Sequence, residues 1–147
     1  MPFPLALANL ETAVLKACAG EGEWPAQVAA GICAGVDYAI ANPEVVETLA
    51  SDDSPGTETL RRYESVIGRL AGFLQAGAPH GKRLPVSTDE ALVAGMVGLV
   101  GDHLRIGRYE RLAELRADLV LLTLLPYLGF AEAREWANRV DRSNPLA

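Results

Sequence analysis

Hydrophobic residues along this chain recur at steps of three and four, which is the spacing of one face of an α-helix. The clearest stripe lies between residues 56 and 76 and consists of Leu60, Tyr63, Ile67, Leu70 and Leu74. No stretch of the sequence alternates apolar and polar residues as a half-buried strand does, and no tandem repeat is present. The pattern predicts an all-α fold, in one domain over residues 1–147.

Proline, asparagine and glycine divide the chain into about seven predicted helices. Residues 5–18 form the first helix. Trp24 and Pro25 open a long second one, because a proline at the first helical position sacrifices no hydrogen bond. Asn42 and Pro43 end that helix and begin a short one. The short helix turns Val45, Val46 and Leu49 inward, and the polar loops at 51–56 and 77–85 flank the fourth helix. The other predicted helices cover residues 56–76, 88–107, 112–128 and 131–140.

Two C-terminal segments carry an unusual pattern of small and large apolar residues. Ser87 and Glu90 form a predicted capping box for a helix that steps through Gly95, Gly98 and Gly101 and stops at Gly107. The next helix carries the run LVLLTLLPYL, in which Pro126 is expected to loosen the last turn before Gly129. Small residues let another backbone come close, and a helix this rich in leucine needs neighbours on several sides. We therefore expect these two helices to form a subunit interface.

The charges are distributed unevenly. Residues 1–60 contain nine acidic side chains and one lysine, a net charge of -8, whereas residues 61–147 contain twelve Lys and Arg against ten acids, a net charge of +2. The total is -6. A phosphate backbone would be repelled by the first sixty residues, so direct nucleic-acid binding by this chain is not expected.

The N-terminus has no basic region before Glu11, so it does not resemble a signal peptide. The apolar run from Leu119 to Ala131 is shorter than the roughly 20 residues of a membrane span. Cys18 and Cys33 have no CxxC spacing and are expected to be reduced thiols. Together these features predict a cytoplasmic protein without a membrane partner.

The residue types of common catalytic sites do not converge in this sequence. His80 and His103 belong to no metal-binding motif, and neither a GxSxG elbow nor a GxxxxGK[ST] phosphate loop is present. The acidic pairs Asp52-Asp53 and Asp89-Glu90 fit a hinge loop and the first turn of a helix, where the helix dipole favours anions. We therefore expect no metal, no cofactor and no enzymatic activity.

Several polar residues interrupt faces that are otherwise apolar. Cys33 and Asp37 share one face of the second helix, Tyr63 interrupts the fourth, and His103 lies one heptad after Met96. Each alone is explained as an ordinary core or surface residue, but together they outline a pocket for a small molecule, which is usually apolar with a few polar groups. The predicted ligand-binding residues are Ile32, Cys33, Val36, Asp37, Tyr63, Ile67, Leu70, Met96, Leu99 and His103.

The order of these segments resembles the C-terminal half of TetR-type transcriptional regulators. Four pieces carry the resemblance, over roughly residues 10–140: EWPAQVAAGICAGVDYAIANPEV, SPGTETLRRYE, LPVSTDEALVAGMVGLVGDHLRIG and LAELRADLVLLTLLPYLGFAEAR. The resemblance implies a helical domain that binds an effector and pairs with a second copy through a four-helix bundle. The basic helix-turn-helix domain of such regulators is missing, so the sequence is expected to be either a fragment of a repressor or a relative without DNA binding.

From this resemblance and the helix pattern we expect a homodimer that binds a small hydrophobic effector among the helices at 24–41, 56–76 and 88–107. Two alternatives remain: a helical homodimeric interaction module without an effector, and an enzyme with an unfamiliar helical site. The predicted dimer interface consists of Val97, Gly98, Gly101, Leu104, Leu115, Leu119, Leu122, Leu125 and Pro126.

Overall fold

Every element that the computed structural model describes is an α-helix. The structure describes residues 3–45, 57–79, 81 and 84–143. Its helices are α1 (Phe3–Ala19), α2 (Trp24–Ala41), α4 (Thr57–Gly77), α5 (Val86–Arg105), α6 (Tyr109–Leu128) and α7 (Phe130–Ser143). The all-α prediction is confirmed for this part of the chain. None of these helices has both the length and the apolar character needed to cross a membrane.

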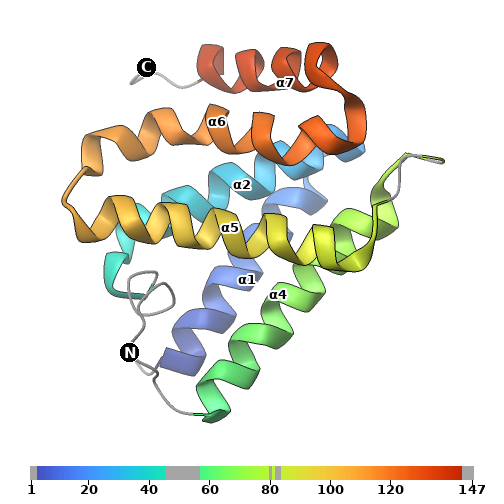
Figure 1. Ribbon diagram of the computed structural model, residues 1–147. Helices are drawn as coiled ribbons and strands as arrows, with labels where there is room; N and C mark the ends of the chain where they lie inside the picture. Colours follow the sequence, from blue (N-terminus) through green and yellow to red (C-terminus); the bar gives the residue numbers. More distant parts are fainter. Residues whose placement is uncertain (1–2, 46–56, 80, 82–83, 144–147) are drawn as a thin grey trace.

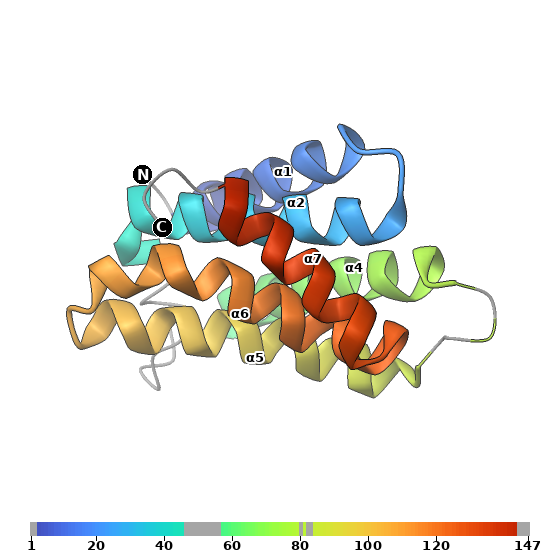
Figure 2. The same ribbon diagram turned by 90° about the horizontal axis from the view of Figure 1, so that it is seen from above.

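The helices are arranged in layers. In Figure 1, α5 and α6 lie side by side at the front, while α7 lies along the upper side of α6. The view from above in Figure 2 places α1 on the opposite side of the molecule from α5, with α2 between α1 and α6. α4 contacts both α5 and α1. The fold therefore has an outer pair, α5 and α6, whose front surface no other described helix covers.

Most helix ends lie at the proline, asparagine and glycine residues that were predicted to begin or end a helix. α2 begins at Trp24 with Pro25 in its first turn, and the backbone N–H of Asn42 closes it by donating to Tyr38 O at 2.8 Å. Gly107 (φ 74°) and Gly129 (φ 84°) adopt left-handed conformations just after α5 and α6. Glycine adopts this region without the steric cost that a Cβ atom imposes. The stops predicted at Gly107 and Gly129 are confirmed.

The capping box predicted at Ser87 and Glu90 is wrong. α5 begins at Val86, two residues before the predicted start, and Pro85 is the residue that precedes it. Pro85 has an extended backbone (φ -56°, ψ 144°), and its carbonyl accepts the Thr88 N–H at 2.9 Å. Ser87 consequently lies inside the first turn, exposed to solvent, and makes no side-chain cap.

Four predictions concern residues outside the described part of the chain. They are the inward positions of Val46 and Leu49, the polar loop at 51–56 with its acidic pair, and the loop position of His80. Val45, at the edge of the described part, is buried as predicted.

Helix α6 is buried along most of its length. Leu112, Val120 and Leu124 are fully buried, and α6 contacts α2, α5 and α7. Pro126 lies in its last turn, and α6 continues as helix to Leu128. The need of the leucine-rich helix for neighbours on several sides is thus largely met within one chain.

The end of α4 is packed tightly against the start of α2. A Cβ atom at Gly77 would lie 2.1 Å from Trp24 Cδ1, a distance that real Cβ atoms do not show. The Trp24 ring has little freedom to move away, because it is buried and packs edge-to-face on Tyr127, with ring centroids 5.1 Å apart. Position 77 therefore requires glycine because the Trp24 ring leaves no room for a Cβ atom, and not because of its backbone conformation.

We predict that Gly77→Ala lowers the free energy of unfolding by about 1–3 kcal/mol, the usual cost of forcing atoms into a filled core. Gly72→Ala, in the same helix, is the matched control, since a Cβ there meets nothing within 4 Å. It should raise stability by roughly 0.5–1 kcal/mol through helix propensity. Urea unfolding followed by circular dichroism measures both changes, and a shift of the same sign in the two variants would contradict the packing.

Candidate functional site

Residues of five helices line an apolar cavity of about 130 Å³ that is partly open to solvent. Its wall is made from α1, α2, α4, α5 and α6, by Leu10, Val14, Cys18, Val28, Gly31, Ile32, Gly35, Val36, Ala39, Leu70, Phe73, Leu74, Val93, Met96, Val97, Val100, Leu119 and Thr123. An engineered apolar cavity of about 150 Å³ in another protein binds benzene. The cavity here therefore has the size for a small hydrocarbon group.

The cavity wall carries no charged group. Its hydroxyl belongs to Thr123, which donates a hydrogen bond to Met96 Sδ at 3.1 Å. Its thiol belongs to Cys18, and burial raises the pKa of this group above its ordinary value, so the thiol stays neutral. A Cβ atom at Gly31 would lie 2.7 Å from Cys18 Sγ, so a glycine at this position gives the thiol its place between α1 and α2. The wall is therefore suited to binding an uncharged, apolar ligand or ligand group.

Four of the predicted ligand-binding residues lie together in this wall: Ile32, Val36, Leu70 and Met96. Ile67 is buried beside the wall in the hydrophobic core, and Tyr63 packs against the same core as a half-buried side chain. The prediction missed the whole contribution of α1, because Leu10 and Val14 form an ordinary amphipathic stripe in the sequence.

The other predicted ligand-binding residues lie outside the cavity wall. Leu99 of α5 is exposed, and the His103 ring is hydrogen-bonded through Nδ1 to the Leu99 carbonyl at 2.9 Å. Cys33 is half-buried, and its pKa is raised mainly by burial.

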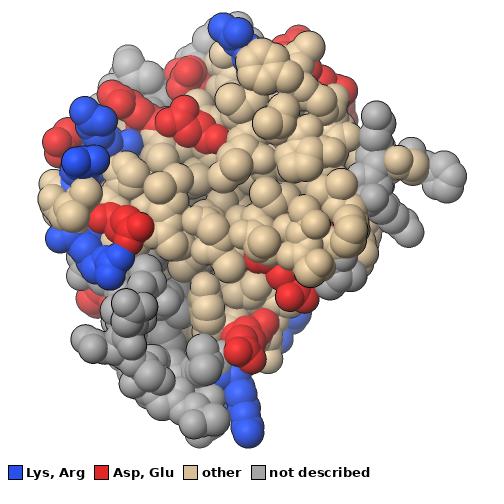
Figure 3. Space-filling model, in the orientation of Figure 1, with Lys and Arg blue, Asp and Glu red and all other residues tan. Residues whose placement is uncertain are grey.

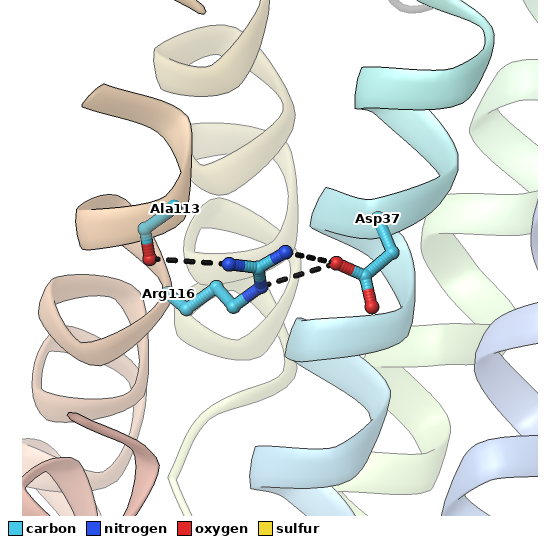
Figure 4. Close-up of polar contacts among 3 residues, drawn as sticks. All are labelled: Asp37, Ala113 and Arg116. Atoms are coloured by element: carbon cyan, nitrogen blue, oxygen red, sulfur yellow. Dashed lines mark hydrogen bonds and ion pairs between the residues drawn. The ribbon is translucent and has the colours of Figure 1, made fainter. Parts of the chain in front are cut away.

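Asp37 takes part in a bridge between α2 and α6. It is exposed, and it accepts hydrogen bonds from Nε (3.1 Å) and Nη2 of Arg116, while Nη1 of the same guanidinium donates to Ala113 O at 3.4 Å (Figure 4). Arg116 lies in the first half of α6 and Asp37 near the end of α2. Asp37, which sequence analysis assigned to ligand binding, thus forms an ion pair with Arg116 in the described residues.

A second group of polar side chains is buried at one end of the bundle. Asp89, in the first turn of α5, is fully buried and accepts at Oδ1 a hydrogen bond from the Tyr127 hydroxyl. Its other oxygen, Oδ2, has no hydrogen-bond partner within the described residues, and neither does Trp24 Nε1. Leaving one buried polar atom without a partner costs about 1–3 kcal/mol. This cluster, Trp24, Asp89 and Tyr127, is a feature that the stability of the fold alone does not explain.

The sequence indicates that Asp89 is buried, but the acidic residue next to it obscures this indication. Asp89 begins the stripe that continues through Val93, Met96, Val100 and Leu104 along the inner face of α5. Glu90, one residue later, is exposed. A carboxylate in register with an apolar stripe is expected to be buried, whereas pairing it with Glu90 suggests a solvated first turn.

The predicted interface residues divide between the core and the surface. Leu104, Leu115 and Leu119 are buried within the single chain, as is Gly101, and Val97 lines the cavity. Leu122 and Leu125 are 44% and 40% exposed, and a Cβ atom at Gly98 would meet nothing within 4 Å. Pro126 is also exposed. An interface would therefore have to use the exposed members of the predicted set.

The front surface of α5 and α6 is largely free of charge. Figure 3 shows this face as a broad area of uncharged side chains, with Lys, Arg, Asp and Glu mainly around its edge. Leu99 of α5 is 37% exposed, Leu122 and Leu125 of α6 are 44% and 40% exposed, and Gly95 and Gly98 leave open space on α5. We call the exposed surface of these two helices the α5–α6 face.

Comparison with known proteins gives no relative: no family model, no curated protein and no solved structure matches the chain. Among the described residues, no three His, Cys, Asp or Glu side chains are grouped as the ligands of a metal ion would be.

The buried hydroxyl of Tyr127 links stability to alkaline pH. Burial, and then the hydrogen bond to Asp89, raise its pKa well above the ordinary value of about 10. In the unfolded chain the phenol ionises first, so the stabilisation is complete below about pH 10 and is lost above it. We predict that the free energy of unfolding falls above about pH 10 and that Tyr127→Phe makes this fall shallower.

Urea unfolding between about pH 8 and about pH 11 measures the effect. Tyr109→Phe is the control, because Tyr109 is 47% exposed. Tyr38 and Tyr63 have raised pKa values too, so some pH dependence should remain in Tyr127→Phe. Equal slopes for Tyr127→Phe and the wild type would contradict the assignment.

Proposed function

We propose that this protein is an effector-binding and dimerisation domain of the kind found in TetR-type regulators. A small apolar molecule binds in the cavity, and two copies pair through the α5–α6 face. The proposal assigns the domain no catalytic step and no contact with nucleic acid. It rests chiefly on the uncharged, apolar cavity that residues of five helices line.

The cavity favours an effector over the alternative of a plain interaction module. Natural protein cores are packed closely, with few voids larger than a water molecule. An interaction module has no use for a hydrocarbon-sized void, which lowers the stability of the fold by leaving side chains without neighbours. A binding site explains both its size and its apolar wall.

The positions of the helices also support coupling between the cavity and pairing. Met96, Val97 and Val100 line the cavity from α5, and Leu119 and Thr123 do so from α6. The same two helices carry the α5–α6 face on their outer side. A ligand that prefers one spacing of these helices shifts the geometry of the pair, by no more than its difference in affinity for the two states.

Filling the cavity tests the binding site. We predict that benzene or indole raises the melting temperature of the wild type, and that Val97→Phe, which places a ring in the cavity, abolishes this rise. Leu99→Phe is the matched control, two residues along α5 and exposed, and it should keep the response. Thermal shift and calorimetric titration measure the effect. If small aromatic compounds do not stabilise the wild type at all, the interaction module is the better explanation.

A charge on the α5–α6 face tests the dimer. A specific interface buries about 1,200 Å² or more, and an arginine in its apolar centre leaves a charge without a partner. We predict that Leu122→Arg keeps the helical content and yields monomer or aggregate in light scattering. Leu15→Arg, at an exposed leucine of α1 on the opposite side, should remain a dimer. An unchanged dimer mass for Leu122→Arg would exclude this face.

A further inference from the structure

The buried polar cluster lies beyond the cavity wall, and none of its three residues is part of the lining. Trp24, Asp89 and Tyr127 are each four residues from a wall residue on the same helix, namely Val28, Val93 and Thr123. Residues four apart on a helix share one face, and four residues rise about 6 Å along the axis. The cluster therefore lies about one helical turn beyond the cavity wall. The starts of α2 and α5 and the ends of α4 and α6 come together at this end of the bundle, on the right in Figure 1.

The cluster has the chemistry of a site for an organic cation. Asp89 is fully buried, and its Oδ2 has no hydrogen-bond partner. No lysine or arginine among the described residues forms an ion pair with it. Tyr127, which donates to Asp89 Oδ1, packs edge-to-face against Trp24 at an interplanar angle of 74°. A buried carboxyl group next to aromatic rings is what an ammonium group requires, since both attract positive charge.

We infer that the ligand of this protein is a hydrophobic amine: its apolar part occupies the cavity, and its protonated nitrogen lies against Asp89 Oδ2 beside Trp24 and Tyr127. The inference rests on the proposed function, because it assigns a chemical class to the ligand of that cavity. To reach the carboxyl group, the nitrogen must extend about one helical turn past Val93. That reach corresponds to a ring with a tether of about three carbons.

Long-range electrostatics favour the same class of ligand. The chain has a net charge of -6, with a charge of -8 over residues 1–60, which raises the local concentration of cations. An anionic ligand would meet this field and then the Asp89 carboxyl group. A neutral ligand without a hydrogen-bond donor would leave Oδ2 without a partner.

Three probes with the same phenylpropyl skeleton test the inference by calorimetric titration of the whole chain: 3-phenylpropylamine, 3-phenyl-1-propanol and 3-phenylpropanoate. We expect the amine to bind about tenfold tighter than the alcohol or more, as a hydrogen bond to a charged group implies, and the carboxylate to bind most weakly. An alcohol that binds as tightly as the amine overturns the inference and leaves the proposed function in place. Failure of every probe to bind overturns both.

A pair of variants places the selectivity at the cluster. Asp89→Asn keeps the shape of the side chain and an acceptor for Tyr127, and it should bring the affinity for the amine down to about that for the alcohol. Glu90→Gln makes the same change of charge at the exposed neighbour and should keep the selectivity. If Asp89→Asn binds the amine as tightly as the wild type does, the inference is wrong. If Asp89→Asn does not fold, the three wild-type affinities decide alone.

Discussion

The packing of α2 against α6 is the contact on which the other helices depend. α1 packs on α2, α5 packs on α6, and α7 contacts both helices of this pair, while α4 joins through α1 and α5. Small residues on α2 and large ones on α6 make the contact close, with Ala39 and Leu119 buried in one core cluster and Ala29 and Leu124 in the other. Both helices of this pair also contribute to the cavity wall, with Val36 and Ala39 from α2 and Leu119 and Thr123 from α6. The same contact thus holds the bundle together and forms one side of the cavity.

The helices themselves were predictable because their ends have local causes. Pro25 at the start of α2, and the left-handed glycines after α5 and α6, act within a few residues, so the sequence alone indicates them. The start of α5 was missed because two local signals compete there, and the backbone of Pro85 prevails over the hydroxyl of Ser87. The partner of each helix has no local signal. The leucine pattern of α6 indicates neighbours on several sides, but it does not distinguish a neighbour in the same chain from one in a second copy.

The site was predictable only in part, for the same reason. The positions of Ile32, Val36, Leu70 and Met96 in the cavity wall were predictable because each lies on the inner stripe of its helix. Asp37 also interrupts a helix face, yet it points to a partner on α6 that no spacing along α2 reveals. Asp89 was expected to be an ordinary first-turn residue, because the helix dipole favours a carboxyl group there, but the structure buries it completely. Burial is a property of the whole fold, and it gives these two aspartates opposite environments.

The bridge between Arg116 and Asp37 has a consequence for how the bundle opens. Two of the contacts that join α2 and α6 are this ion pair and the packing of Trp24 on Tyr127. Their positions on α2 are 13 residues apart, about 20 Å along the helix axis. The first is an ion pair with an exposed carboxylate, which dissolved salt screens, and the second is a buried aromatic contact, which salt hardly affects. The two ends of the α2–α6 pair thus differ in their response to ionic strength. In concentrated salt the amide hydrogens near Asp37 should exchange with solvent sooner than those near Trp24, so that the bundle loosens from one end.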